Sequence, residues 1–171
     1  MNAIETVRVR RSIRKFKQDA VEEEKINLLK EAALRSPSSR NRNPWKFWFV
    51  RNPELIKKLA QCKTSGSQFL EGAKLAVVVG GDENVSDVWV EDCSIASIFI
   101  QLAAQTLGLG SCWVQVRGRN AQKGSAQDYV RDLLDIEKNI QIASIIAVGY
   151  PDEIKKPLLF DELQFEKIVD L

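Results

Sequence analysis

The sequence predicts a single domain of mixed α/β or α+β architecture. Its 171 residues are the size of one ordinary domain, and an apolar content of 44% is enough for a conventional core. Segments with helical spacing of apolar residues alternate with short apolar segments of strand length. Because no repeat, low-complexity segment or linker divides the chain, we expect residues 1–171 to form one domain.

The predicted helices are recognised from apolar residues that repeat every three to four positions. Ile26, Leu29 and Ala33 share one face of a helix over about 21–35, which ends at Ser36-Pro37. The other predicted helices are a short one that ends near Val9, one that starts at Asn52-Pro53, a long one from Ser86 or Asp87 to about Leu107, and one that starts at Ser125.

Strands are predicted over 45–50, 75–79, 111–116 and 140–148. The run over 75–79 is apolar throughout, so we expect it to be a central strand that is covered on both faces.

The C-terminal segment, about 152–171, is apolar but shows no clear single period. Its apolar residues include Leu158, Leu159, Phe160, Leu163, Phe165, Ile168 and Val169. A segment this apolar needs a surface to cover, and on a small domain that surface can belong to a partner subunit.

Composition excludes several classes of function. The chain holds 25 basic and 23 acidic residues, and this net charge of +2 is far from that of a general nucleic-acid binder. The absence of histidine removes the usual general base and the usual metal ligand. Cys62, Cys93 and Cys112 lack the spacing of a zinc site or a disulfide framework, so we expect neither a metal site nor disulfides.

The N-terminal residues 1–14 are polar and basic, which is not typical of a secretory leader, so the sequence predicts a cytoplasmic protein. The longest apolar stretch, 94–108, contains Gln101 and Gln105 and falls short of the roughly 20 residues that cross a bilayer. We therefore expect a buried helix there and no membrane association.

The segment from Arg10 to Phe16, RRSIRKF, is the sharpest candidate for ligand binding. In an extended backbone alternate residues share a face, so Arg10, Ser12 and Arg14 would converge. Two guanidinium groups beside a hydroxyl form a receptor for a phosphate dianion. The alternative interpretation is an ordinary solvated basic stretch.

A second candidate is the loop over 36–45, SPSSRNRNPW, which follows a predicted helix and leads into a strand. Its short polar side chains could present donors and acceptors to a flat polar heterocycle, although the same residues are common in any turn. The glycines of 108–110 lead into a strand and lack the final glycine of a dinucleotide-binding loop. For Cys112 a buried, inert thiol is favoured over a nucleophile.

Taken together and in order, four segments resemble the nitroreductase family of FMN enzymes. They are RRSIRKF over 10–16, SPSSRN with NPW over 36–45, GLGS over 108–111 and AVGYP over 147–151. Each segment alone is a weak signal, but the four in this order cover nearly the whole chain.

The resemblance implies an α+β fold with a central, mostly antiparallel sheet flanked by helices, in an intertwined homodimer with FMN at the subunit interface. The residues that it implies for FMN are Arg10, Ser12 and Arg14 at the phosphate, with Arg11 in the same motif; Pro37, Ser38, Ser39 and Asn41 at the isoalloxazine of the partner's flavin; Gln68 at the ribityl chain or the ring; Trp113, Val114 and Gln115 along the ring; and Lys155 or Lys156 closing the phosphate site.

The function implied by the resemblance is an FMN-dependent NAD(P)H oxidoreductase. It would take electrons from NADH or NADPH and reduce nitroaromatic, quinone or similar small acceptors by ping-pong two-electron transfer. The flavin carries this chemistry, so no catalytic side chain is expected. The alternatives are a non-catalytic protein that stores or delivers a flavin, and a regulatory or nucleic-acid-binding domain that uses the basic residues of 10–17, which the near-neutral charge disfavours.

Overall fold

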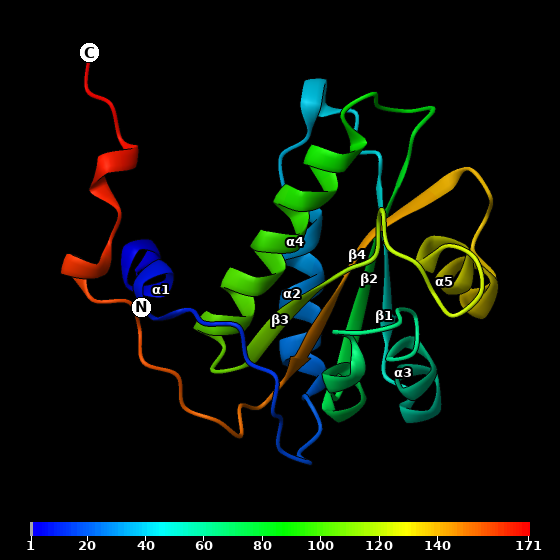
Figure 1. Cartoon of the computed structure of the whole chain (residues 1–171), viewed down its shortest axis with the longest axis horizontal. Helices are drawn as coiled ribbons and strands as arrows, with labels where there is room; N and C mark the ends of the chain where they lie inside the picture. The colour runs from blue at the N-terminus through cyan, green and yellow to red at the C-terminus, as the bar shows by residue number, and fades with distance from the viewer. Residues whose placement is uncertain (1) are drawn as a thin grey trace.

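A four-stranded sheet and five α-helices make up the computed structural model, which describes residues 2–171 (Figure 1). The helices are α1 (Ala3–Val9), α2 (Glu23–Leu34), α3 (Pro53–Leu59), α4 (Trp89–Thr106) and α5 (Ala126–Leu134). The strands are β1 (Trp45–Val50), β2 (Leu75–Asp82), β3 (Gly110–Gln115) and β4 (Ile140–Gly149).

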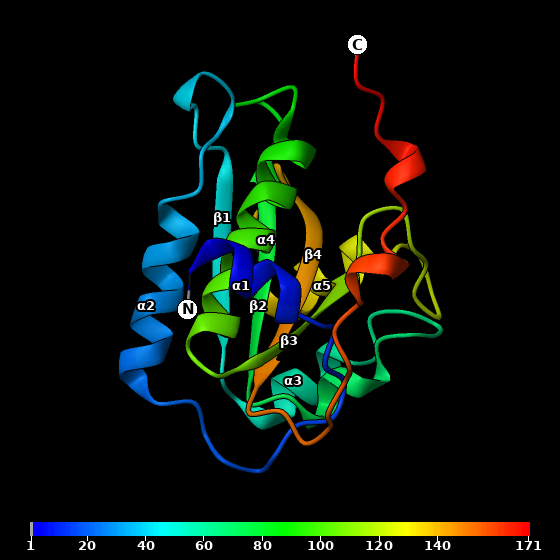
Figure 2. The same cartoon turned by 90° about the vertical axis from the view of Figure 1, so that its left-hand side faces the viewer.

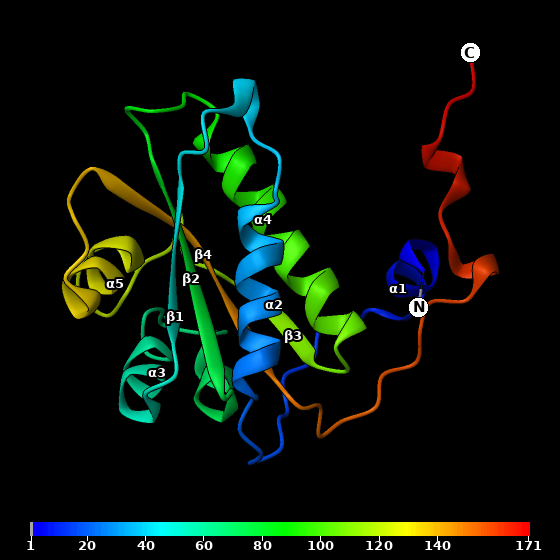
Figure 3. The ribbon, with the colours of Figure 1, turned by 180° about the vertical axis from the view of Figure 1, so that it is seen from behind.

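All neighbouring strands run antiparallel, in the order β1-β2-β4-β3. This arrangement confirms the predicted α+β class and the prediction of a buried central strand, because β2 lies between β1 and β4. Helices α2 and α4 cover one face of the sheet and α3 and α5 the other (Figures 1 and 3). The apolar core therefore has two layers, one on each side of the sheet.

Side chains cap the starts of α1, α3 and α5, whereas α2 and α4 begin without a side-chain capping hydrogen bond. The Asn52 side chain accepts hydrogen bonds from the first turn of α3, and Ser125 accepts one from the backbone N–H of Asp128 in α5. The predicted cap of the long helix is wrong. Helix α4 begins after Val88, which makes no capping hydrogen bond, while Ser86 is buried and donates its hydroxyl to Asp92 at 3.0 Å.

The first turn of α4 lies directly on the end of β2. A Cβ atom added at Gly81 would come within 2.9 Å of the Cys93 sulfur and 3.1 Å of the Trp89 ring. Real Cβ atoms do not approach other atoms this closely, so a glycine at position 81 is what allows this contact between helix and sheet.

The segment that follows α1 runs in an extended conformation, as considered from the sequence, and it lies beside β3, which the sequence did not predict. Ser12 forms a parallel bridge with Ser111, whose carbonyl accepts a hydrogen bond of 2.9 Å from the Ile13 N–H. Ile13 and Phe16 are buried in the core. Ile13 and Phe16 thus attach the segment to the sheet, and the basic side chains of the segment remain at the edge of the sheet.

The C-terminal segment 152–171 leaves the sheet and passes beside α1 (Figures 1 and 2). It contains two short 3₁₀ turns, Phe160–Glu162 and Phe165–Lys167, and its apolar side chains are exposed, Phe160 by 75%. Within residues 2–171, no helix combines the length and the apolar character needed to span a bilayer.

Candidate functional site

Three cations and a hydroxyl gather around the side chain of Cys112 in β3. Cys112 is only 1% exposed, and burial raises the pKa of its thiol, while Arg14, Ser12, Lys155 and Arg10 all lie close enough to lower that pKa. We refer to Arg10, Ser12, Arg14 and Lys155 as the cationic clamp. The convergence of Arg10, Ser12 and Arg14 expected from the sequence is therefore present, and the thiol is buried as predicted.

Glu153 organises the cationic clamp although it is an acid. One of its carboxylate oxygens accepts hydrogen bonds from the backbone N–H groups of Arg14 at 2.5 Å and Lys15 at 3.2 Å, and it lies 3.6 Å from the Lys155 ammonium. The Arg14 N–H contributes most to holding the pKa of the Glu153 carboxyl below its usual value. Among the clamp cations Glu153 pairs with Lys155 alone, and within the described residues Arg10 and Arg14 form no ion pair, so their guanidinium groups are available to an anion.

The structure also distinguishes Lys155 from Lys156, the two candidates between which the sequence could not decide. Lys155 belongs to the cationic clamp, whereas the backbone carbonyl of Lys156 accepts a hydrogen bond from the Arg11 guanidinium. Arg11 is thus directed at the C-terminal segment and attaches it to the segment that carries the clamp.

The outer edge of β3 presents backbone groups next to the clamp. Because the Ser111 carbonyl faces outward to Ile13, the backbone groups of Trp113 and Gln115, two and four residues on, face the same edge. The described chain offers no strand to this part of the edge. The Trp113 indole N–H donates to the Gln115 side chain at 2.9 Å, and the Gln115 amide donates to the Arg117 carbonyl at 2.8 Å.

The side chain of Val114 does not lie at the outer edge of β3, where the sequence resemblance placed it along the flavin ring. This side chain is fully buried in the core on the α3 and α5 side of the sheet, because side chains alternate along a strand. The backbone N–H and C=O of Val114 face β4, so Val114 offers no polar group to a ligand at the outer edge.

Gln68 lies beside the clamp. Its side-chain oxygen accepts hydrogen bonds from the N–H groups of Gly66 at 2.9 Å and Ser67 at 3.2 Å. The amide NH₂ group of Gln68 therefore points away from these two N–H groups. The next residue, Phe69, places its ring 5.6 Å from the Arg14 guanidinium. Residues from three separate parts of the chain therefore meet at the edge of β3.

The loop after α2 has an unusual backbone. Arg40, Asn41 and Asn43 have φ angles of 52°, 55° and 50°, a left-handed conformation that residues other than glycine seldom adopt. The Ser38 hydroxyl donates to the Asn43 side chain at 2.7 Å and accepts from the Asn43 N–H at 2.9 Å, which helps to hold this shape. Such strain is concentrated at ligand-binding loops.

Asp92, in the first turn of α4, fixes this loop and was not predicted from the sequence. It is 2% exposed, and its two carboxylate oxygens accept hydrogen bonds from the Ser39 N–H at 2.8 Å and the Ser86 hydroxyl at 3.0 Å. Its position at a helix N-terminus also favours a negative charge.

The loop and the cationic clamp lie at opposite ends of α4 (Figure 1). The helix has 18 residues, which corresponds to a length of about 27 Å. Pro37, Ser38, Ser39 and Asn41 therefore cannot reach a group held at the cationic clamp of their own chain.

Replacing Asp92 tests how the loop is held. Asp92→Leu is expected to lower the free energy of unfolding by about 2–5 kcal/mol, because it leaves the part-buried Ser39 N–H and the buried Ser86 hydroxyl without their acceptor. Asp92→Asn keeps one acceptor oxygen and should lose less than half of that. Urea unfolding gives the two free energies, and equal stability of Asp92→Leu and the parent would contradict the assignment.

Comparison with known proteins identifies the family of the chain. The sequence model described as the nitroreductase family matches residues 7–66 and 61–150. The chain belongs to the nitroreductase family. Within the family it is similar to a protein of Archaeoglobus fulgidus named as an NADH dehydrogenase/NAD(P)H nitroreductase, with 38% identity over 156 residues that cover 89% of this chain and 87% of the relative.

Solved structures of other nitroreductase-family proteins share the fold. An FMN-dependent nitroreductase from Clostridium difficile R20291 superposes with a TM-score of 0.95 at 42% identity, covering 98% of each chain. A protein from Parabacteroides distasonis, named as an NADH dehydrogenase/NAD(P)H nitroreductase, gives a TM-score of 0.89 at 33% identity and covers 98% of this chain and 96% of that one.

Proposed function

We propose that this nitroreductase-family chain is an FMN-dependent NAD(P)H oxidoreductase that reduces nitroaromatic, quinone or similar small acceptors by ping-pong two-electron transfer. The observation that carries the proposal is the cationic clamp beside the outer edge of β3. The name of the similar Clostridium difficile protein, an FMN-dependent nitroreductase, and the nicotinamide donors in the names of the relatives support it.

The cationic clamp fits the phosphate of FMN. Arg10, Arg14 and Lys155 offer cationic donors, and Ser12 adds a hydroxyl. Guanidinium groups match phosphate oxygens in charge and in geometry, so this donor set suits a phosphate dianion better than a neutral ligand. Glu153 holds the Arg14 backbone and the Lys155 ammonium in place for this contact.

The ring of the cofactor would lie along the outer edge of β3. The backbone groups of Trp113 and Gln115 and the free amide of Gln68 would orient it there. When bound, FMN supplies the heterocycle that accepts and releases the electrons. The chain's own residues bind and orient the cofactor and exclude water, and a chain without histidine can do all of this.

A second copy of the chain would complete each site. The loop of Ser38 and Ser39 and the clamp of the same chain lie at opposite ends of α4, a helix about 27 Å long, so we infer that the loop reaches the flavin bound by the partner. Exposed apolar side chains support a homodimer, because α1 leaves Ile4 and Val7 exposed by 61% and 60%. Helix α4 adds the exposed side chains of Ile95 and Ile98.

The partner's C-terminal segment would cover the outer edge of β1. A groove there is lined by Leu34 of α2 and by Trp45, Phe47 and Phe49 of β1. Among the described residues, nothing accepts a hydrogen bond from the buried Trp45 indole N–H. An apolar segment in extended conformation would bury its side chains in this groove, pair with the free edge of β1 and offer carbonyl acceptors.

The visible spectrum of the purified protein tests the proposal. We expect a yellow protein whose flavin absorbance disappears when NADH or NADPH is added without oxygen and returns when a quinone or nitroaromatic acceptor follows. A yellow protein that neither donor bleaches would instead favour flavin storage. A colourless protein that does not bind added FMN would refute both functions.

A further inference from the structure

A basic pocket lies between two loops next to the proposed flavin site. It is lined by Lys63, Thr64 and Ser65 of the loop that precedes Gln68, and by Arg119 and Asn120 of the loop that follows β3. All charged residues of these two loops are basic, since Arg117 and Lys123 are the only others over 62–67 and 116–125. Two cations and two hydroxyl groups in one hollow are the donors that a phosphate group needs.

The two loops are held in place by hydrogen bonds. The Thr64 N–H donates to the Asn120 carbonyl at 3.3 Å and joins one loop to the other. The backbone of Arg119 is fixed on both sides, because its N–H donates to Val116 at 3.1 Å and its carbonyl accepts from Ala126 at 2.8 Å. A pocket whose walls are already ordered costs less conformational entropy when a ligand binds.

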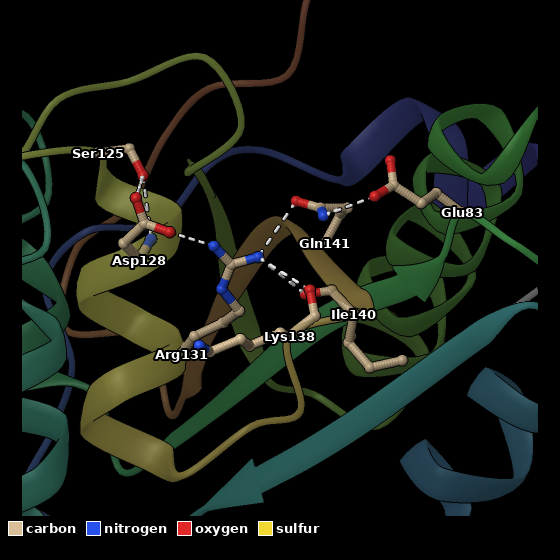
Figure 4. Close-up of polar contacts among 7 residues, drawn as sticks. All are labelled: Glu83, Ser125, Asp128, Arg131, Lys138, Ile140 and Gln141. Atoms are coloured by element: carbon tan, nitrogen blue, oxygen red, sulfur yellow. Dashed lines mark hydrogen bonds and ion pairs between the residues drawn. The ribbon is translucent and has the colours of Figure 1, made fainter.

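The cations of the pocket are not neutralised. Across residues 2–171, neither Lys63 nor Arg119 forms an ion pair. The acids nearest to the two loops in sequence have other partners, since Glu71 lies 3.9 Å from Lys57 and Asp128 is bound by Ser125 and Arg131. Figure 4 shows Asp128 turned toward Arg131, which is in turn directed at the backbone of the α5–β4 connection.

Both loops are attached to residues of the proposed flavin site. The Gln68 side chain accepts hydrogen bonds from Gly66 and Ser67 of the first loop. The Gln115 amide donates to the carbonyl of Arg117, with which the second loop leaves β3. A molecule that places one end over the flavin at β3 would extend its remaining part over these loops.

We propose that the pocket of Lys63 and Arg119 binds a phosphate group of the nicotinamide donor. This inference rests on the proposed oxidoreductase function and adds a specificity site to it. The phosphate is either the 2′-phosphate that only NADPH carries or the diphosphate that NADPH and NADH share, and the two sources differ in what the experiment shows.

The test is a Lys63→Ala/Arg119→Ala variant of the FMN-loaded protein, compared with the parent. With one fixed acceptor, kcat/KM for NADPH is expected to fall at least about tenfold with kcat nearly unchanged, because the lost contacts bind the donor without taking part in the reaction. A second readout without turnover is calorimetric binding of adenosine 2′,5′-bisphosphate and of 5′-AMP. A matched control is Lys57→Ala/Lys138→Ala, which changes the net charge equally outside the pocket.

The outcomes separate the possibilities. Loss confined to NADPH and to the bisphosphate assigns the pocket to the 2′-phosphate, and an equal loss for NADH and 5′-AMP assigns it to a phosphate that both donors share. Unchanged kinetics and binding, or the same loss in the control variant, would overturn the proposal. Failure of the parent itself to oxidise either donor would refute the proposed function instead.

Discussion

An Arg10→Ala/Arg14→Ala variant is expected to purify without most of its FMN. The substitutions remove two of the three cations around Cys112 that would hold the phosphate. Each charge-assisted hydrogen bond contributes roughly 1.5–3 kcal/mol, so the loss of both should weaken FMN binding by about a hundredfold or more. The ratio of flavin to protein absorbance and a titration of the released protein with FMN measure the effect.

A suitable control is Arg8→Ala/Lys17→Ala, which removes the same charge from exposed positions on either side of the clamp. The control should stay yellow. If the Arg10→Ala/Arg14→Ala protein also keeps a full complement of FMN with unchanged affinity, the cationic clamp is not the phosphate site.

Removal of residues 158–171 is expected to give monomers and to weaken flavin binding at the same time. The deletion keeps Glu153 and Lys155, and it takes away eight apolar side chains: Leu158, Leu159, Phe160, Leu163, Phe165, Ile168, Val169 and Leu171. Since burial of one such side chain contributes about 1.5–3 kcal/mol, the partner contact would lose several kcal/mol even if only some of them are buried. Light scattering during size-exclusion chromatography gives the mass of the particle, and the flavin content is read in the same run.

A chain that ends after Val169 serves as the comparison, because it loses only Asp170 and Leu171 and keeps the other seven apolar side chains. It should remain dimeric and yellow. A shortened 1–157 chain that has the same mass as the parent would show that the segment does not hold two copies together. Monomers that retain flavin at the parent's affinity would show that each site is complete within one chain.

Local signals in the sequence predicted most of the elements. The strand over 45–50, the start of α3 at Asn52-Pro53 and the cap of α5 at Ser125 depend on neighbouring residues, and the structure has them where the sequence places them. The ends of the longer elements differ from the predicted ends by a few residues. Ser86 does not cap α4 as expected, because its hydroxyl bonds to the buried Asp92 carboxylate instead of to the first backbone N–H groups of the helix.

Residues that act over long sequence separations could not be found in this way. Asp92 holds a loop 53 positions away, and Glu153 holds a backbone 139 positions away. Lys155 and Lys156 are chemically alike, and only the direction in which the backbone turns decides which one joins the clamp. The burial of Val114 did leave a signal, because alternation along β3 puts it on the same face as Cys112.

The glycine at position 81 ties the shape of the loop to a remote point in the sheet. The side chain of any larger residue there would press against Cys93 and Trp89 and push the first turn of α4 away from the sheet. Asp92 would move with that turn. The distance between Ser39 and the sheet therefore depends on the absence of a Cβ atom at position 81. A substitution at position 81 would therefore shift the loop of Ser39, and with it any ligand contact that the loop makes, without touching the ligand itself.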